Sequence, residues 1–323
     1  YPTGHTDTLE VAARRAVLTG VNQTGAKLQV ARADEMGVEF FETTAHGGAR
    51  PSHAEWQGRQ FHRGGAVDYM GKHYPDFEAA TGYGTGAGLC GWNCRHTFFS
   101  IFPELGAPPA WTQESLEALN ARDIEYNGGK YTRYEISQMQ RARERTVRKY
   151  KRRYLAEDAA GADTTASAVK LRQARQELTD FISATGGRAD SARTSVAGFG
   201  RSASSKASWA AKRQEQLDAV NNDLTALRQS GKIKLTGTAV TPPALPNTLS
   251  FEGHAIEQMG KRQISLAQAN EIAEHAILAI SQRNGTQHAY YSEKGFIVIR
   301  QDGSIGTVGW LDDAGKQIVE VMK

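Results

Sequence analysis

Cysteine is scarce in this sequence, in which Cys90 and Cys94 are the only two among 323 residues. Two cysteines imply no disulfide framework, so we expect a reducing compartment. No apolar run approaches the roughly 20 residues that a membrane-spanning helix needs, and no secretory signal peptide is recognisable. We therefore expect no membrane span. The sequence starts with Tyr1 instead of Met, so we expect an excerpt or a processed product.

Charges of both signs are present, but they are unevenly distributed. The formal net charge is +4 and the isoelectric point is about 9.0. Residues 141–153 contain eight Lys or Arg residues and one Glu, whereas residues 250–323 are slightly acidic. A basic surface that binds a partner is therefore expected in the middle of the chain. The mean hydropathy of −0.53 fits two or three domains with long exposed helices.

The spacing of apolar residues predicts an α+β protein whose N-terminal part is rich in helices. Helices are expected at residues 7–37, 112–119, 131–157, 166–185 and 206–230. The glycines near residues 19–25 predict a kink or a break in the first of them. A strand is expected at residues 38–44. Residues 45–109, rich in Gly, His and aromatic residues, show little periodicity, so we expect specific side-chain contacts or a metal to hold them.

Prolines in residues 236–247 predict a stiff linker and a domain boundary. We therefore expect three parts. Residues 1–160 form a helix-rich region with a Gly-, His- and Cys-rich loop segment. Residues 161–247 form a helical and proline-containing linker. Residues 248–323 form a small domain of two helices packed on an antiparallel sheet.

Three segments in the N-terminal half are distinctive. They are AVLTGVNQT at 16–24, TAHGGARPSHAEWQG at 44–58 and GTGAGLCGWNCRH at 84–96. Together they resemble the phage minor capsid proteins, relatives of the MuF head-morphogenesis proteins that sit at the portal inside the phage head. The resemblance covers about residues 1–154. It implies a virion protein that contacts portal and capsid proteins and acts in head assembly or DNA delivery.

Histidine and cysteine in two of these segments are ligand types that zinc selects. The candidate ligands are His46, His53, Cys90 and Cys94, and His96 lies beside them. The spacing Cys-x3-Cys-x-His lies within the loose range of structural zinc sites. The alternative is that the histidines hydrogen-bond to loop backbone and the cysteines are small buried thiols.

The basic segment predicts contacts with the phosphates of packaged DNA, independent of base sequence and sensitive to salt. The residues expected to make them are Arg141, Arg145, Arg148, Lys149 and Arg152. The alternatives are a solvated helix face or a surface that binds an acidic part of the portal.

The last part of the chain is predicted to contain two short helices followed by strands. The first helix starts near Gly253, and Ser265 with Gln268 forms a capping box for the second, whose apolar spacing continues to Ile280. Strands are expected at 289–292, 296–300 and 305–310. Asp302-Gly303 predicts a tight hairpin between the last two strands.

The order of these elements, with His-Ala-x6-Arg-x-Ile-Ser at 254–265, resembles the barnase/EndoU/colicin/RelE-like nucleases, as do the later Tyr-Tyr, Lys and Thr. The resemblance implies an endoribonuclease that needs no metal or cofactor, because the 2′-hydroxyl of the RNA attacks its own phosphate. An immunity protein and delivery from the virion to the bacterial cytoplasm are then expected. The alternative is a structural, DNA-binding head-morphogenesis protein whose C-terminal domain is an inactive interaction module.

Five residues are the expected catalytic set: His254, Arg262, Tyr291, Lys294 and Thr307. An imidazole can act as base or acid near neutral pH, which suits His254. Arg262 suits the phosphate, for which Lys294 or Arg300 is an alternative cation. Tyr291, or Tyr290 next to it, is expected to stack on a base or donate a proton. Thr307 is expected to hydrogen-bond the phosphate.

Overall fold

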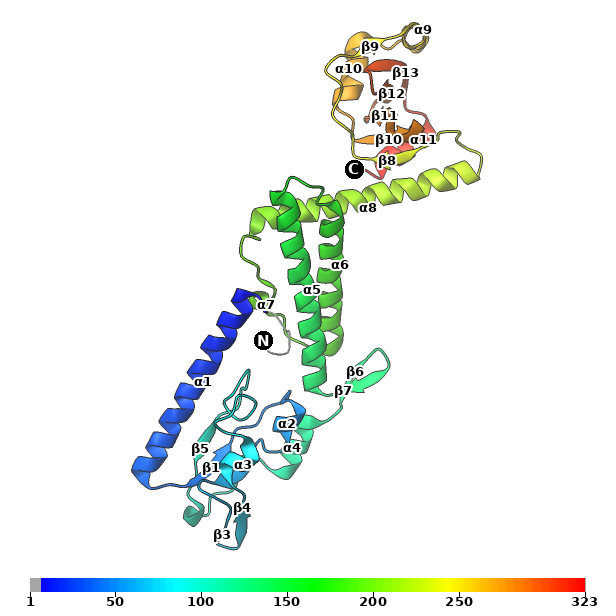
Figure 1. Cartoon of the computed structure of the whole chain (residues 1–323). Coiled ribbons are helices and arrows are strands. Elements are labelled where there is room, and N and C mark those ends of the chain that lie inside the picture. The colour runs from blue at the N-terminus through cyan, green and yellow to red at the C-terminus, as the bar shows by residue number, and fades with distance from the viewer. Residues whose placement is uncertain (1–6, 323) are drawn as a thin grey trace. The chain divides into compact units, whose positions relative to one another are not determined.

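The computed structural model describes residues 7–322 and is α+β, as expected (Figure 1). It divides into two compact units. Unit 1 contains the chain up to Glu144 together with Leu178–Ala189, and unit 2 contains Arg145–Glu177 together with the chain from Asp190 onward. Residues 1–6 of the expected first region and residue 323 lie outside the described residues. Among the described helices, none combines the length and apolar composition that a membrane crossing requires.

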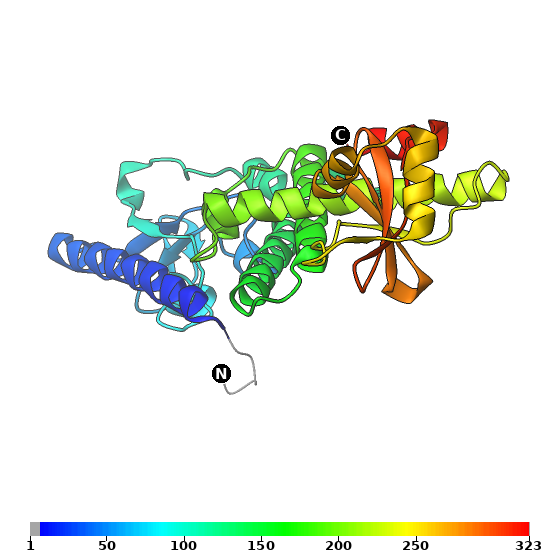
Figure 2. The same ribbon diagram turned by 90° about the horizontal axis from the view of Figure 1, so that it is seen from above.

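Unit 1 starts with α1 (Leu9–Met36), which is one uninterrupted helix in Figures 1 and 2. The expected kink or break is therefore wrong. Gly20 and Gly25 lie inside the helix with open space where a side chain would be, so each costs only about 1 kcal/mol of helix stability. Buried Ala26 and Ala33 pack against the core of unit 1, so tertiary packing supports the helix in addition to its local propensity.

A three-stranded antiparallel sheet forms the centre of unit 1. Strand β1 (Phe40–Thr43) lies between β2 (Gln60–His62) and β5 (Phe98–Ser100), which confirms the strand expected at 38–44. The rings of Phe41, Phe77 and Phe98 contact one another with centroids 4.9–5.1 Å apart. The remaining short elements of this unit are α2 (Pro51–Ala54), β3 (Val67–Tyr69), β4 (Lys72–Tyr74), α3 (Phe77–Thr81), η1 (Pro103–Leu105), α4 (Gln113–Asn120), β6 (Ile124–Tyr126) and β7 (Gly129–Tyr131).

Long helices follow, close to their expected positions. They are α5 (Arg133–Ala159), α6 (Thr165–Thr185) and α8 (Arg201–Gln229), with the short α7 (Ser191–Thr194) before the last. Helix α8 contributes Leu217, Val220, Leu224 and Leu227 to a core in unit 2, whereas Trp209 is 66% exposed. The large apolar side chains that α8 contributes to this core therefore come from its second half.

The C-terminal part of unit 2 is a six-stranded sheet in the order β8-β10-β11-β12-β13-β9. All neighbouring strands are antiparallel except β13 and β9. The core residues place α9 and α10 on one face of the sheet and α8 and α11 on the other. The elements are β8 (Thr238–Val240), β9 (Ser250–Phe251), α9 (Gly253–Arg262), α10 (Leu266–Glu274), β10 (Leu278–Gln282), η2 (Arg283–Gly285), β11 (Gln287–Tyr291), β12 (Gly295–Arg300), β13 (Ser304–Trp310) and α11 (Asp313–Glu320).

The C-terminal part differs from the expectation in two places, the end of the second helix and the start of the sheet. Helix α10 starts at the expected capping box but ends at Glu274, and Leu278–Gln282 forms β10 instead of continuing the helix. Buried Leu278 and Ile280 face α8 while Ala279 faces α9 and α10, so both faces of β10 are covered. Strand β8 forms one edge of this sheet, and the second half of α8 packs against it. Residues 248–323 therefore contain only part of the core.

Candidate functional site

Helix α9 packs along strand β13, and Arg262 at its end is tied to that strand. Ala255 and Met259 face the sheet and are buried. The Nη1 atom of Arg262 donates to the carbonyl oxygen of Val308. Trp310 Nε1 donates to the carbonyl oxygen of Arg262 at 2.9 Å. The guanidinium is thereby held at the edge of β13.

Arg262 and Thr307 reach the same face of the sheet. Thr307 pairs with Val298 and Gly309 pairs with Phe296, and directly opposite residues on antiparallel strands point to the same face. A Cβ atom at Gly309 would lie 2.6 Å from Arg262 Nη1 and 2.7 Å from the Phe296 ring. The guanidinium carbon lies 6.0 Å from the centre of that ring. The side chain of Arg262 therefore bends around the edge strand towards the face that carries Thr307.

This face is incompletely covered around β12 and β13. Along β12 the residues on the other face are buried, whereas Phe296, Val298 and Arg300 are half-buried. The register shifts at Val298/Ile299, which leaves Gly306 as an extra residue next to Thr307. Such a bulge redirects side chains and is common beside functional sites. We call the surface formed by Arg262, Phe296, Val298, Arg300 and Thr307 the β12–β13 face.

Glu252 connects the start of α9 to the β12–β13 face. Arg300 Nη1 lies 2.8 Å from Glu252 Oε2 and 3.0 Å from Ser304 Oγ. Hydrogen bonding and charge attraction from Glu252 raise the pKa of Arg300. Glu252 was not in the expected set, because its role depends on the meeting of α9 and β12.

His254 is the second residue of α9, at the end opposite Arg262, and it is exposed. Its ring makes no hydrogen bond with any residue in the described range. Eight residues separate it from Arg262, which is about 12 Å along the axis and about 80° around it. Viewed down the helix axis, buried Ala255 points to the sheet. His254 and Arg262 lie to one side of Ala255, and exposed Ile256 lies to the other side. One helix therefore carries an imidazole and a guanidinium on the same flank.

Tyr291 lies in the core between the sheet and helices α8 and α11. Its exposed fraction is 6%, and its ring stacks on Phe296 with centroids 5.6 Å apart. Burial, and to a lesser extent Asp312, raises the pKa of this phenol. Tyr290 is also buried, on the opposite face with α9 and α10. Helices cover both tyrosines, so neither lies on the β12–β13 face as an exposed side chain.

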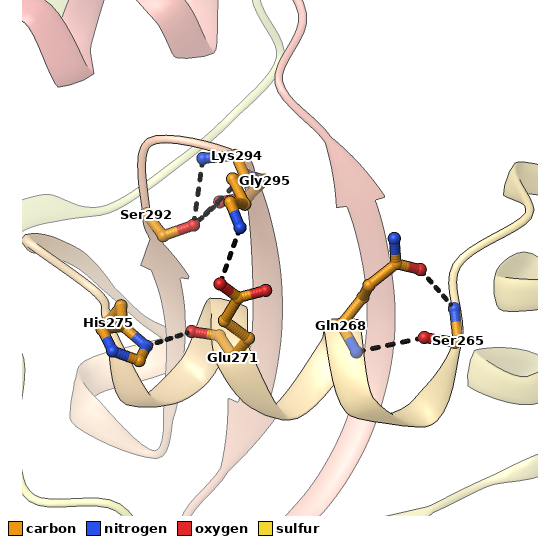
Figure 3. Close-up of polar contacts among 7 residues, drawn as sticks. All are labelled: Ser265, Gln268, Glu271, His275, Ser292, Lys294 and Gly295. Carbon is orange, nitrogen blue, oxygen red and sulfur yellow. Dashed lines mark hydrogen bonds and ion pairs between the residues drawn. The ribbon is translucent and has the colours of Figure 1, made fainter.

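Lys294 joins a turn to helix α10, as Figure 3 shows. Its Nζ atom lies 2.6 Å from Glu271 Oε1, and this hydrogen bond lowers the pKa of Glu271. The backbone nitrogens of Lys294 and Gly295 donate to Ser292 Oγ in the same turn. Because α10 covers the face opposite to Thr307, the structure does not bring Lys294 and Thr307 together.

The basic residues of α5 differ in their exposure and in their contacts. Arg148 donates to the Arg193 carbonyl oxygen, and Lys151 donates to that of Thr194 at 2.6 Å. Arg145 and Lys149, four residues apart and therefore on one helix face, are exposed. Arg141 and Arg152 are half-buried. The expected DNA-binding set thus contains two exposed cations, and Arg148 also holds the segment after α7.

The histidines and cysteines of unit 1 meet at one place. Cys94 Sγ lies 3.7 Å from His53 Nδ1 and 3.6 Å from His96 Nδ1. Cys90 is 1% exposed and directs its thiol to the His96 carbonyl oxygen, 3.5 Å away. His46 stacks on His96 with ring centroids 4.3 Å apart. Of the four expected ligands, His53 and Cys94 converge, and His96 joins them in place of Cys90 and His46.

Burial controls the protonation of this cluster. Burial, together with the nearby His46 and His53, lowers the pKa of His96 to about 3. Burial also lowers the pKa of His53 and raises the pKa of the Cys94 thiol. The two rings are therefore neutral near pH 7. A buried, protonated thiol is a poor nucleophile, which disfavours a catalytic cysteine here.

Comparison with known proteins identifies the N-terminal part. A family model described as phage minor capsid protein 2 matches residues 1–183. This match confirms the resemblance of the N-terminal half and ends before the C-terminal sheet. No curated protein and no solved structure matches the chain.

Proposed function

The chain belongs to the phage minor capsid protein 2 family, and from that premise we propose a virion protein whose C-terminal sheet cleaves RNA. The family points to the virion as the location and to virion proteins as partners. We extend this to a place at the portal inside the head and to delivery into the bacterial cytoplasm. The ribonuclease would then act after delivery, and an immunity protein would protect a cell that makes it.

One observation carries the proposal for RNA cleavage. Helix α9 holds exposed His254 on the same flank as Arg262, and Arg262 bends towards the face that carries Thr307. Cleavage by the 2′-hydroxyl needs a group that moves a proton, a cation for the developing charge and a donor for a phosphate oxygen. His254, Arg262 and Thr307 supply these functions in that order. The Thr307 hydroxyl makes no hydrogen bond to other described residues, so it is available for the phosphate.

Arg300 replaces Lys294 as the second cation in this proposal. Arg300 lies on the β12–β13 face and is half-buried, whereas Lys294 pairs with Glu271 beside α10. Phe296, also on this face, offers part of its ring for contact with a base. Tyr291 supports Phe296 from the core by stacking. In this arrangement Tyr291 and Lys294 position other groups and do not touch the substrate.

A second candidate function has its own supporting observation. Arg262 and Arg300 already have partners, the Val308 carbonyl oxygen and Glu252. A face whose cations are engaged also suits an inactive interaction module in a structural head-morphogenesis protein. In either case Arg145 and Lys149 are the residues of α5 that we propose to contact packaged DNA.

The test uses the whole chain, since residues 248–323 lack part of their core. Purified protein is incubated with total RNA and with tRNA in the presence of a chelator. We expect cleavage to leave 2′,3′-cyclic phosphate ends, and we expect His254→Ala to abolish it. His275→Ala is the matched control, because His275 is also exposed and only hydrogen-bonds the Glu271 carbonyl oxygen. Cleavage by His254→Ala at the wild-type rate, or no cleavage by wild type, would favour the interaction module.

A further inference from the structure

We propose that His53, Cys94 and His96 bind one zinc ion in unit 1 through Nδ1, Sγ and Nδ1. The three ligand groups have ligand atoms within 4.8 Å of one another. Zinc bonds are about 2.0–2.1 Å to nitrogen and about 2.3 Å to sulfur, so a tetrahedral ion holds a nitrogen and a sulfur about 3.6 Å apart. The two nitrogen–sulfur distances in this cluster are 3.7 Å and 3.6 Å. Both distances therefore match the separation of a nitrogen and a sulfur that bind the same zinc ion.

The hydrogen bonds around the cluster orient both imidazoles for a metal. His53 Nε2 lies 2.9 Å from the Ala87 carbonyl oxygen, which can only accept, so this nitrogen carries the proton. His96 Nε2 lies 3.0 Å from Gln57 Oε1. Both neutral rings then have their lone pairs at Nδ1, facing Cys94. Metal-binding histidines are usually held by such an acceptor on the other nitrogen.

The orientation of Gln57 does not depend on an assumed amide assignment. Its side-chain oxygen also accepts from the backbone nitrogen of His46 at 3.1 Å, and a backbone N–H is always a donor. Its side-chain nitrogen donates to Asn120 Oδ1 at 3.3 Å. The atom facing His96 is therefore the oxygen, and His96 Nε2 must donate to it.

Hydrogen bonding alone does not satisfy the cluster. The thiol of Cys94 has one proton, but two imidazole lone pairs face its sulfur. One of the two Nδ1 atoms must then lie against sulfur without a proton between them. A zinc ion bound by the thiolate satisfies both nitrogens at once, and the thiol proton is released to solvent.

The fourth position of a tetrahedral ion is assigned to a water molecule. His46 lies against His96, and its Nε2 atom is buried with no hydrogen-bond partner among the described residues. Its Nδ1 atom lies 3.2 Å from the Gly47 carbonyl oxygen, so the proton lies on Nδ1 and Nε2 is an acceptor. His46 is thus the group that can accept a hydrogen bond from the metal-bound water.

The ion would connect segments that have little regular structure of their own. His53 belongs to α2, and Cys94 and His96 belong to the glycine-rich segment 84–96. Asn22 of α1 donates to the carbonyl oxygens of both Cys94 and His96. Zinc at this position would tie α2 to the loop and, through Asn22, to α1, so that metal binding would stabilise the fold of unit 1.

Metal analysis of the full chain, purified under reducing conditions, tests the assignment. We expect about one zinc per chain in the wild type. Cys94→Ser is expected to lose the ion. Cys90→Ser is the matched control, because it removes a buried thiol four residues away whose sulfur faces a carbonyl oxygen and no imidazole. Equal zinc content in wild type and Cys94→Ser would mean adventitious binding elsewhere and would overturn the assignment.

A second measurement keeps the test decisive if Cys94→Ser does not fold. Chelator-treated wild type is titrated with Co²⁺ and followed by absorption and by thermal unfolding. We expect a thiolate-to-cobalt charge-transfer band that saturates at about one equivalent, with a rise in the unfolding temperature. Absence of that band, combined with wild-type zinc far below one per chain, would refute the zinc site.

Discussion

Arg300 and Glu252 form an ion pair of 2.8 Å that joins strand β12 to the residue preceding α9. The pair lies on the β12–β13 face, where we propose that RNA phosphate binds. A carboxylate at this position holds the start of the helix against the sheet. It also competes with phosphate for the Arg300 guanidinium.

Removing the charge of Glu252 should therefore strengthen RNA binding. For Glu252→Gln we expect a severalfold lower KM for RNA, because Arg300 loses its competing anion. For Arg300→Ala we expect a severalfold higher KM. Steady-state cleavage at several salt concentrations measures both, and equal KM values for the two variants would contradict a role of Arg300 in binding.

Gly309 is expected to be essential for the position of Arg262. In Gly309→Ala the new Cβ atom would lie 2.6 Å from Arg262 Nη1 and 2.7 Å from the Phe296 ring. Relief of this overlap should cost about 1–3 kcal/mol of unfolding free energy and displace the guanidinium. Urea unfolding and RNA cleavage are the measurements.

The control for this change is Gly306→Ala in the same strand. There the new Cβ atom meets Arg300 Nη2 at 3.6 Å and Val298 at 3.8 Å, which are ordinary contacts. We expect stability and cleavage close to wild type. A larger loss in Gly306→Ala than in Gly309→Ala would mean that the described packing around Arg262 is incorrect.

Lys294→Ala should alter the response to acid without slowing RNA cleavage. The hydrogen bond and charge of Lys294 lower the pKa of Glu271 in the folded protein. A carboxyl group whose pKa is lowered by folding stabilises the folded protein at pH values above its pKa in the unfolded chain, about 4.3 for Glu. This stabilisation is lost as the pH falls through the pKa of the group in the folded protein. The unfolding temperatures of wild type and Lys294→Ala should therefore differ at pH 7 and converge once the pH falls below the lowered folded pKa of Glu271. A large fall in cleavage rate would instead return Lys294 to the catalytic set.

The C-terminal sheet should need α8 for stability. Leu224 is fully buried in the core that α8 forms with the sheet, so Leu224→Ala should cost about 2–5 kcal/mol. A fragment of residues 248–323 should be much less stable than one of residues 201–323. Circular dichroism during urea unfolding compares the two fragments. Equal midpoints would show that the sheet is independent of α8 and β8.

We expect the proposed DNA binding by α5 to depend on its exposed cations, Arg145 and Lys149. We expect Arg145→Ala and Lys149→Ala each to lower the slope of log affinity against log salt by about 0.9. Arg148 also holds the Arg193 carbonyl oxygen, so Arg148→Ala should lower thermal stability as well. Filter binding with duplex DNA measures the slopes, and slopes unchanged in both exposed variants would exclude this helix face.

The ends of helices that are set by residues close together in the sequence were predictable. Ser265 and Gln268 form the expected capping box at the start of α10 (Figure 3). The end of α10 was not predictable, because the apolar spacing of residues 276–280 fits a helix as well as a strand. Pairing of β10 with β8 and β11 decided between them.

For the candidate sites, too, the sequence indicated the residue types but not their positions in the fold. The zinc ligand types were visible in the sequence, but Cys90 has a left-handed φ of 60°, and its thiol lies in the core while His96 joins Cys94. Tyr291 was expected at the RNA site, yet α8 and α11 cover it. Helix α8 lies outside the predicted domain of residues 248–323, and α11 was not among its expected elements.

By itself, the sequence determined the family of the N-terminal half, the long helices and the residue types to which we assign the proposed RNA cleavage and zinc binding. Only the tertiary structure decided which of those side chains meet. The reason is physical: local spacing fixes the periodicity of a segment, whereas burial, strand register and ligand distances depend on parts of the chain far away in sequence.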